Sequence, residues 1–169
     1  MDLQATGEFL RTVGPLARFS DDEVAPLAAA MRERRLRAGH VLAREGARGT
    51  EMYFIKDGTL AIVKGVTGGI EQVVARIGAG EFVGEMALFD RRPRSATIRA
   101  ETDAELLVLD RNAVAVLVNL NPVTATAFLR ALSEEFIARL RRSNQLIAEL
   151  TCAVLEASGF QVEGVTIER

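Results

Sequence analysis

The chain has few of the residues that metal centres and disulfides require. Its 169 residues include one cysteine, Cys152, one histidine, His40, and no tryptophan. A single cysteine cannot form an intramolecular disulfide, and together with one histidine it cannot supply a His/Cys metal cluster. No nucleophile with an accompanying base stands out either. We therefore expect no metal centre, no resident cofactor, no catalytic residues and no enzymatic activity.

Long apolar runs and strong charge of one sign are also missing. No apolar stretch approaches the ~20 residues that span a bilayer. The segment Met1–Glu8 lacks the basic and apolar regions of a signal peptide. The net charge of −2 argues against a strongly basic nucleic-acid surface. We expect a cytoplasmic protein with no membrane and no nucleic acid among its partners, which also suits a single free cysteine.

The pattern of apolar residues changes twice along the chain. Residues 6–31 are predicted to be helical, with Ser20 as an N-cap and Glu23 three residues later in a capping box. Over residues 34–110, short β runs alternate with glycine turns, as in a barrel or jelly roll. From Asp110 onward the chain is again predicted to be helical.

Two glycine pairs predict hairpins within the β region. Asp57-Gly58 lies between two apolar runs and predicts a type I′ turn, which needs positive φ at both central residues. Gly68-Gly69 predicts a second hairpin tip. In a separate turn, Gly46 and Gly49 are expected to serve the shape of the backbone and not the chemistry of a site.

Residues 80–97 are too interrupted to form one ordinary element, with the sequence GEFVGEMALFDRRPRSAT. Gly80 and Gly84 let the backbone come close to another group. A short helix beginning near Glu85 would present free N–H groups where an anion is stabilised. Arg94 adds a planar, permanently charged fork that can pair two phosphate oxygens.

The carboxylate of Glu85 would oppose a phosphate unless it has a task of its own. A carboxylate accepts hydrogen bonds, and a ribose 2′-hydroxyl is a suitable donor. Ala87 and Ala96 are small and leave room for a ligand. The stretch therefore predicts a site for one phosphate, one sugar hydroxyl and a flat or apolar remainder.

Two segments, Gly84–Leu88 and Pro93–Thr97, resemble the phosphate-binding cassette of cyclic nucleotide-binding domains. That family includes bacterial catabolite activators, regulatory subunits of cyclic AMP-dependent kinase and cyclic nucleotide-gated channels. The resemblance implies that Glu85 binds the ribose 2′-hydroxyl and Arg94 the cyclic phosphate, with help from the backbone of the next residues. The ligand-binding residues expected in the cassette are Gly84, Glu85, Met86, Ala87, Arg94, Ser95 and Ala96.

The resemblance covers residues 6–150 and implies an α+β, mainly β, fold. We expect an eight-stranded antiparallel β-roll or jelly roll with N-terminal helices and a long C-terminal helix. The predicted domain spans residues 6–157, with the β-roll at about 34–110 and the C-terminal helices at about 111–157. A short tail, 158–169, follows, and its alternating apolar residues are strand-like.

Asp110 is predicted to cap a helix over residues 111–120, and Asn121-Pro122 to begin one of about 35 residues. Its apolar residues recur at three- or four-residue steps and form a seam of Leu129, Leu132, Phe136, Leu140, Ile147, Leu150 and Val154. A second copy of the chain is the simplest partner for this seam. The alternative is that the seam packs only on its own barrel.

The seam is interrupted by polar residues, Ser143 and Asn144, one turn after Arg139. In relatives of the activators, an arginine and small polar residues on this helix cover the base of the ligand. The resemblance therefore adds Arg139, Ser143 and Asn144 to the expected ligand-binding residues. Equally, Ser143 and Asn144 could fix the register of a dimer, as buried polar seam residues do.

The sequence thus predicts a non-enzymatic cyclic nucleotide sensor that repositions its C-terminal helix, dimerises through it and acts on a downstream protein not identified by the sequence. Cyclic AMP is favoured over cyclic GMP because Ser95 resembles the bacterial activators. About a dozen residues after the long helix are too few for a winged helix-turn-helix. The alternative function is a ligand-independent structural or interaction module that keeps the fold.

Overall fold

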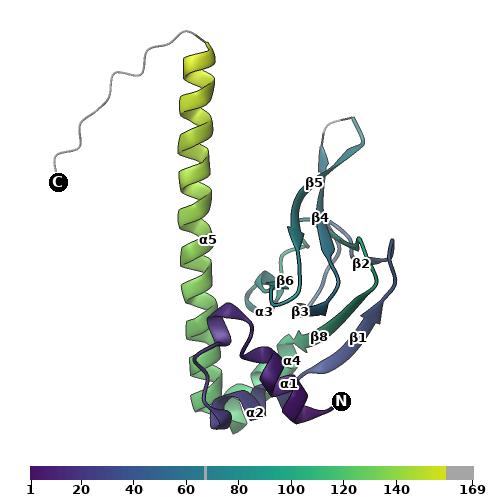
Figure 1. The fold of residues 1–169 in the computed structure, drawn as a ribbon, viewed down its shortest axis with the longest axis vertical. Coiled ribbons are helices and arrows are strands. Elements are labelled where there is room, and N and C mark those ends of the chain that lie inside the picture. Colours follow the sequence, from purple (N-terminus) through teal and green to yellow (C-terminus); the bar gives the residue numbers. More distant parts are fainter. Residues whose placement is uncertain (67, 159–169) are drawn as a thin grey trace, which may run out of the picture. The chain divides into compact units, whose positions relative to one another are not determined.

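The computed structural model describes residues 1–66 and 68–158 of the chain. Residues 1–129 form one compact unit, and a second begins at Arg130. The first unit contains two four-stranded antiparallel sheets with helices before and after them (Figure 1). This arrangement confirms the predicted α+β, mainly β, roll of eight strands.

The strands are short, as the glycine spacing predicts. The first sheet has the order β1-β8-β3-β6 and the second the order β2-β7-β4-β5. The strands are β1 (Arg32–Leu36), β2 (Val41–Ala43), β3 (Glu51–Asp57), β4 (Leu60–Val66), β5 (Ile70–Ile77), β6 (Phe82–Val83), β7 (Thr97–Ala100) and β8 (Ala104–Asp110).

The core lies between the two sheets and also behind the first one. Side chains alternate between the two faces of a strand. On β3, Tyr53 and Ile55 belong to a cluster with Leu60 and Ile98 of the opposite sheet, so they face inward. Met52 and Phe54 point to the other face and are also fully buried. The α3 turn packs against β3 and α4 against β8, which explains burial on both faces.

The Asp57-Gly58 hairpin prediction is wrong. The two strands that flank this dipeptide, β3 and β4, belong to different sheets, so the turn is a crossover between sheets. Only Gly58 has a positive φ, 87°, which excludes type I′. A Cβ atom on Gly58 would lie 2.3 Å from the carbonyl oxygen of Asp103, because the neighbouring crossover packs directly on this turn.

The second hairpin prediction is confirmed. Strands β4 and β5 pair antiparallel from Leu60↔Ile77 to Val66↔Ile70 around Gly68-Gly69, and both glycines have positive φ. β5 is an edge strand, and every residue of it from Ile70 to Arg76 is exposed. The hairpin therefore extends beyond the packed part of the roll (Figure 1).

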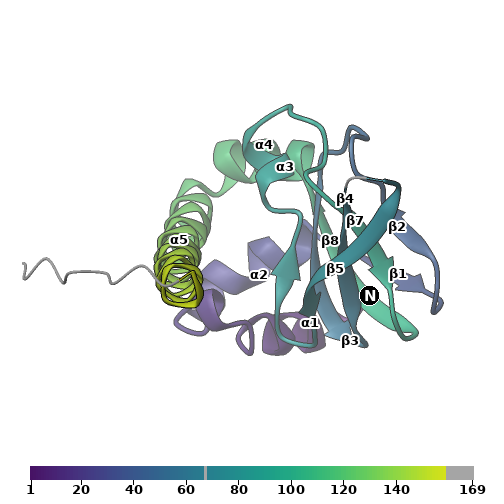
Figure 2. The same cartoon turned by 90° about the horizontal axis from the view of Figure 1, so that it is seen from above.

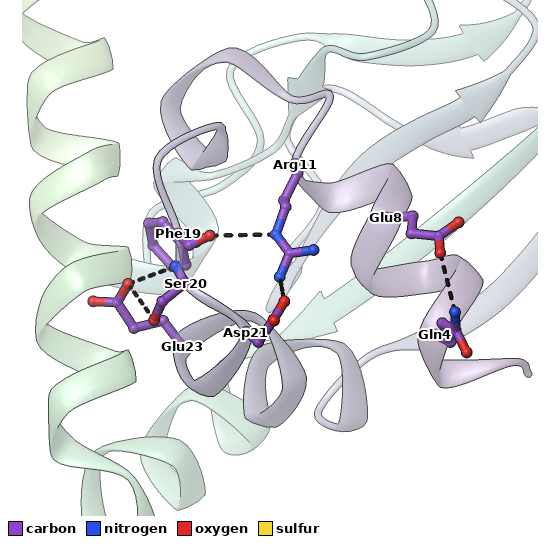
Figure 3. Close-up of polar contacts among 7 residues, drawn as sticks. All are labelled: Gln4, Glu8, Arg11, Phe19, Ser20, Asp21 and Glu23. Carbon is purple, nitrogen blue, oxygen red and sulfur yellow. Dashed lines mark hydrogen bonds and ion pairs between the residues drawn. The ribbon is translucent and has the colours of Figure 1, made fainter.

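The N-terminal helices begin earlier than predicted but keep the predicted cap. They are α1 (Leu3–Leu10), a 3-10 turn (Gly14–Leu16) and α2 (Asp21–Ala29). The Glu23 carboxylate accepts hydrogen bonds from the backbone N–H and the hydroxyl of Ser20, at 3.0 and 3.1 Å (Figure 3). Arg11 joins the end of α1 to α2 by donating to the Phe19 carbonyl and pairing with Asp21.

Helix α4 (Arg111–Leu120) begins as predicted, with the Asp110 side chain accepting from the N–H of Ala113 at 2.9 Å. Helix α5 (Pro122–Ala157) has 36 residues, so the predicted long helix is confirmed. Its part from Arg130 onward belongs to the second unit. The tail beyond Ser158 lies outside the described residues. None of the helices described is long and apolar enough to cross a membrane.

Candidate functional site

The predicted cassette forms one local structure between β6 and β7. Gly84, with φ 84°, turns the chain from β6 into α3, a single helical turn (Met86–Phe89). A Cβ atom on Gly84 would lie 2.7 Å from Nη1 of Arg94 and 3.1 Å from the carbonyl oxygen of Glu51. Gly84 is therefore required both by its backbone conformation and by the groups that approach it.

Arg94 reaches back across the cassette and is held by backbone carbonyls. Its Nη1 donates to the carbonyl of Gly84 at 3.2 Å and its Nη2 to the carbonyl of Glu51 at 2.6 Å. Its guanidinium carbon lies 5.6 Å from the centre of the Tyr53 ring, within cation–π range. Among the described residues, no carboxylate pairs with Arg94, so its charge is positioned but not neutralised.

A neighbouring loop supports Arg94 from the other side. The N–H of Arg94 donates to the carbonyl of Ala47 at 2.8 Å, and the N–H of Gly46 donates to the carbonyl of Arg94 at 2.9 Å. Gly46 has a positive φ, 76°, in line with the predicted backbone role. Gly49 has a different role: a Cβ atom there would lie 2.6 Å from Nε of Arg94. Gly49 leaves the space that Arg94 occupies.

Tyr53 forms the apolar wall beside Arg94. Its hydroxyl donates to the Glu51 carboxylate at 2.8 Å. Burial, and next the hydrogen bond to Glu51, raise the pKa of Tyr53 to about 12. The same carboxylate pairs with Arg32 and lies 3.8 Å from Arg34, whereas the backbone carbonyl of Glu51 holds Arg94. Glu51 thereby fixes Arg94 without offering it a counter-charge.

Glu85 follows Gly84 directly and is buried, with 8% of its surface exposed. Within residues 1–66 and 68–158 it is the only charged residue in the buried set. Burying a carboxylate is unfavourable unless polar groups compensate it. Glu85 lies next to Gly84, whose carbonyl holds Arg94, so one carboxylate and one guanidinium lie in the same cassette. This is the pair that the sequence predicts for a sugar hydroxyl and a phosphate.

The α3 turn is anchored from α4. Arg111, the first residue of α4, donates through its guanidinium to the carbonyls of Ala87 and Asp90 at the end of α3. The N–H of Arg111 donates to the carbonyl of Thr50 at 2.9 Å. One helical turn is not stable alone, and a cation at its C-terminal end stabilises it. Figure 2 shows α3 beside α4. Sequence reasoning missed Arg111, since nothing in its spacing points to α3.

The other predicted cassette residues lie on the α3 turn or directly after Arg94. Ala87 is buried and Met86 is 55% exposed. The N–H of Ala87 already donates to the carbonyl of Gly84 at 3.1 Å, whereas no described residue accepts from the N–H of Met86. Ser95 is exposed, and its carbonyl accepts from Nζ of Lys64 at 2.5 Å. Ala96 is half-buried.

The three remaining predicted residues lie on the second unit. Arg139 pairs with Glu135 through Nε at 2.9 Å, one helical turn away. Ser143 and Asn144 are exposed on α5. The structure thus brings Gly84 and Arg94 into contact within the cassette, and a ligand contact from any of the ten predicted residues stays a prediction. In the part of the chain that the structure describes, no group of three or more His, Cys, Asp and Glu residues could hold a metal ion.

Comparison with known proteins agrees with this geometry. A family model described as the cyclic nucleotide-binding domain matches residues 33–121, more than half of the chain. The chain is 30% identical over 112 residues to the CRP-like cAMP-activated global transcriptional regulator of Mycobacterium tuberculosis. That match covers 66% of this chain and 48% of the regulator, so the chain spans about half the length of this curated relative.

Two solved structures are similar over most of their length. One is the N-terminal domain of a transcriptional regulator from Streptomyces coelicolor, with 34% identity, a TM-score of 0.70, and coverage of 82% of this chain and 94% of that chain. The other is a cyclic nucleotide-binding domain from Methylobacillus flagellatus, with 29% identity, a TM-score of 0.78, and coverage of 87% and 84%. The chain belongs to the cyclic nucleotide-binding domain family.

Proposed function

We propose that this protein is a non-enzymatic sensor that binds a cyclic nucleotide in the cassette of residues 84–96. Arg94 pairs with the cyclic phosphate, and Glu85 accepts a hydrogen bond from the ribose 2′-hydroxyl. The observation that carries the proposal is the guanidinium of Arg94, fixed by two backbone carbonyls and an aromatic ring and without a carboxylate partner among the described residues. A cation that is already held in place and has no carboxylate partner binds an anion without a further loss of side-chain entropy.

Cyclic AMP is the favoured ligand. The Mycobacterium tuberculosis relative is named for activation by cAMP. Ser95, which directly follows Arg94, resembles the residue at this place in the bacterial activators. The backbone N–H of Met86, which has no acceptor among the described residues, is available as a further donor to the phosphate.

Ligand binding is coupled to the C-terminal helix in this proposal. A nucleotide shifts a conformational equilibrium only as far as it binds one state better than the other. Closure of α5 over the base, with Arg139, Ser143 and Asn144 contacting it, would supply that difference. Residues 6–157 would then act as one domain, followed by a tail.

We further propose a homodimer that forms through α5. Within the second unit, a row of large apolar side chains on α5 is more than half exposed. Leu140, Ile147 and Val154 recur every seven residues, and Leu150 lies three residues after Ile147. This is the spacing of a coiled-coil seam. The sensor would act in the cytoplasm, on a protein that recognises the ligand-bound state.

Calorimetric titration with cyclic AMP and cyclic GMP tests the ligand assignment. Removal of Arg94 leaves a bound phosphate without its partner, which costs roughly 3–5 kcal/mol by analogy with broken buried ion pairs. We therefore expect Arg94→Ala to weaken binding by about a hundredfold to a few thousandfold. Arg18→Ala removes an exposed charge outside the cassette and should bind like the wild type.

Equal affinity of wild type and Arg94→Ala would disprove the role of Arg94. If the folded wild-type protein bound neither nucleotide, the ligand-independent interaction module would become the better explanation.

A further inference from the structure

Four exposed arginines lie on two joined loops, one after β2 and one within the cassette just before Arg94. Arg44 and Arg48 belong to the loop after β2, and Arg91 and Arg92 to the loop before Arg94. The two loops are joined by the backbone hydrogen bonds of Arg94 to the first loop, at 2.8 and 2.9 Å. We refer to Arg44, Arg48, Arg91 and Arg92 as the arginine rim.

The arginine rim differs from most cations on the β-roll. Elsewhere on the roll, arginines pair with glutamates. Arg35 pairs with Glu105 on the neighbouring strand at 2.8 Å, and Arg76 pairs with Glu101, directly after β7, at 2.9 Å. Within residues 1–66 and 68–158, no carboxylate lies within ion-pair distance of a rim arginine. Neutralisation by neighbours is therefore the pattern of the roll, and the rim departs from it.

The acidic residues of the two loops are engaged in other contacts. The Glu45 carboxylate accepts from Nζ of Lys64 at 2.5 Å and from the N–H of Gly65 at 3.0 Å. The Asp90 carboxylate accepts from the backbone N–H of Arg92 at 3.2 Å. Without the four rim arginines, the chain's net charge of −2 would become −6 (−2 − 4 = −6). The rim thus places four positive charges on two joined loops of a chain whose net charge is negative.

We propose that the arginine rim is a docking surface for an acidic segment of a partner protein. Guanidinium groups bind carboxylates through two parallel hydrogen bonds and are more weakly hydrated than ammonium groups. Arginine is enriched in protein interfaces for these reasons. Several guanidinium groups on two adjoining loops match a short run of aspartate or glutamate side chains.

A nucleic acid fits the same spot less well. The loops, residues 44–50 and 90–96, contain no aromatic side chain on which a base could stack. Binding along a duplex favours a basic stripe or face, whereas the rim is confined to two joined loops. A long polyanion would also meet the remaining charge of −6. The docking surface goes beyond the proposed nucleotide site, although Arg94 shares one of its loops.

Fluorescence anisotropy with a labelled oligoglutamate peptide tests the rim, with the full chain at about 20 mM and about 150 mM salt. Replacement of Arg48 and Arg92 by Ala should weaken binding about fivefold to twentyfold, and replacement of all four arginines should abolish it. The matched control is Arg18→Ala with Arg37→Ala, which removes two exposed charges away from these loops. All variants should keep the unfolding temperature of the wild type.

The proposal is overturned if the wild type fails to bind the peptide at low salt, or if the control pair weakens binding as much as the rim pair. Tighter, rim-dependent binding of a short duplex DNA of similar charge would also overturn it in favour of a nucleic-acid site. Arg94→Ala separates this question from the nucleotide proposal. That variant should lose nucleotide binding and retain most of the peptide affinity.

Discussion

The cassette and the part of α5 beyond Arg130 differ in whether their side chains already have partners within the chain. In the cassette, polar groups are already satisfied by distant parts of the chain, as the carbonyl of Glu51 shows for Arg94. On α5 beyond Arg130, large apolar side chains such as Ile147, 62% exposed, are mostly open to solvent. The cassette holds a positioned guanidinium, which suits the proposed anion, whereas the exposed apolar side chains of α5 suit the proposed second copy of the chain.

The largest effect of a substitution is expected on α5, where it should weaken dimerisation. Replacement of Ile147 by Glu places a charge in the seam of the proposed homodimer, where it would be buried without a partner. We expect at least about a hundredfold weaker dimerisation, which corresponds to roughly 3 kcal/mol. Sedimentation velocity over a range of protein concentrations measures it.

Ala148→Glu is the matched control, because it adds the same side chain at the next exposed position, off the seam. It should dimerise like the wild type. If the wild-type protein remained monomeric at high concentration, the homodimer proposal would be wrong, and the exposed apolar row would have to bind a different protein.

A smaller effect is expected from a glycine outside the predicted cassette. Gly49→Ala would place a methyl group 2.6 Å from Nε of Arg94, so the guanidinium must move away from its carbonyl acceptors. Loss of one well-aligned charged hydrogen bond costs about 1.5 kcal/mol or more, so nucleotide affinity should fall at least about tenfold. Calorimetric titration measures this affinity.

Gly14→Ala supplies the control for this substitution. Gly14 also lacks a positive φ, and no atom lies within 4 Å of the position that its Cβ would take. Its nucleotide affinity should equal that of the wild type. Equal affinities for both alanine variants would show that Arg94 does not depend on the space beside Gly49.

The sequence predicts the cassette well because its constraints are local. A Gly before a one-turn helix, an acid at its start and an arginine after a proline are all visible within residues 84–94. The long helix is similarly visible, since its cap and its apolar spacing are written along one segment. These features need no knowledge of what lies across the fold.

The missed features depend on contacts between distant segments. The role of Gly49 comes from Arg94, 45 positions away (94 − 49 = 45), and that of Arg111 from carbonyls on α3. The hairpin prediction at Asp57-Gly58 was wrong for the same reason. The dipeptide suits a hairpin, but β3 and β4 lie in different sheets, and Asp103 from another crossover packs on Gly58. The residues of a turn predict that the chain turns there, but they do not predict whether the two flanking strands pair with each other.

The smallest effect concerns Tyr53, which reports on the cassette directly because it is the only tyrosine and the chain has no tryptophan. Burial and the hydrogen bond to Glu51 raise its pKa to about 12, from an ordinary value of 10.0. The raised pKa stabilises the fold fully below pH 10.0, and this stabilisation is lost as the pH rises toward about 12. Ultraviolet absorbance of the phenolate during alkaline titration should therefore show a midpoint near 12 for the folded protein.

Titration in denaturant is the control and should return the ordinary midpoint of about 10. Arg94→Ala sharpens the measurement, because the nearby guanidinium favours the phenolate and lowers the pKa of Tyr53. Without that cation the midpoint should move to still higher pH. A folded-state midpoint near 10 in the wild type would mean that Tyr53 is open to water, and the wall beside Arg94 would then be too loose to hold the guanidinium for a phosphate.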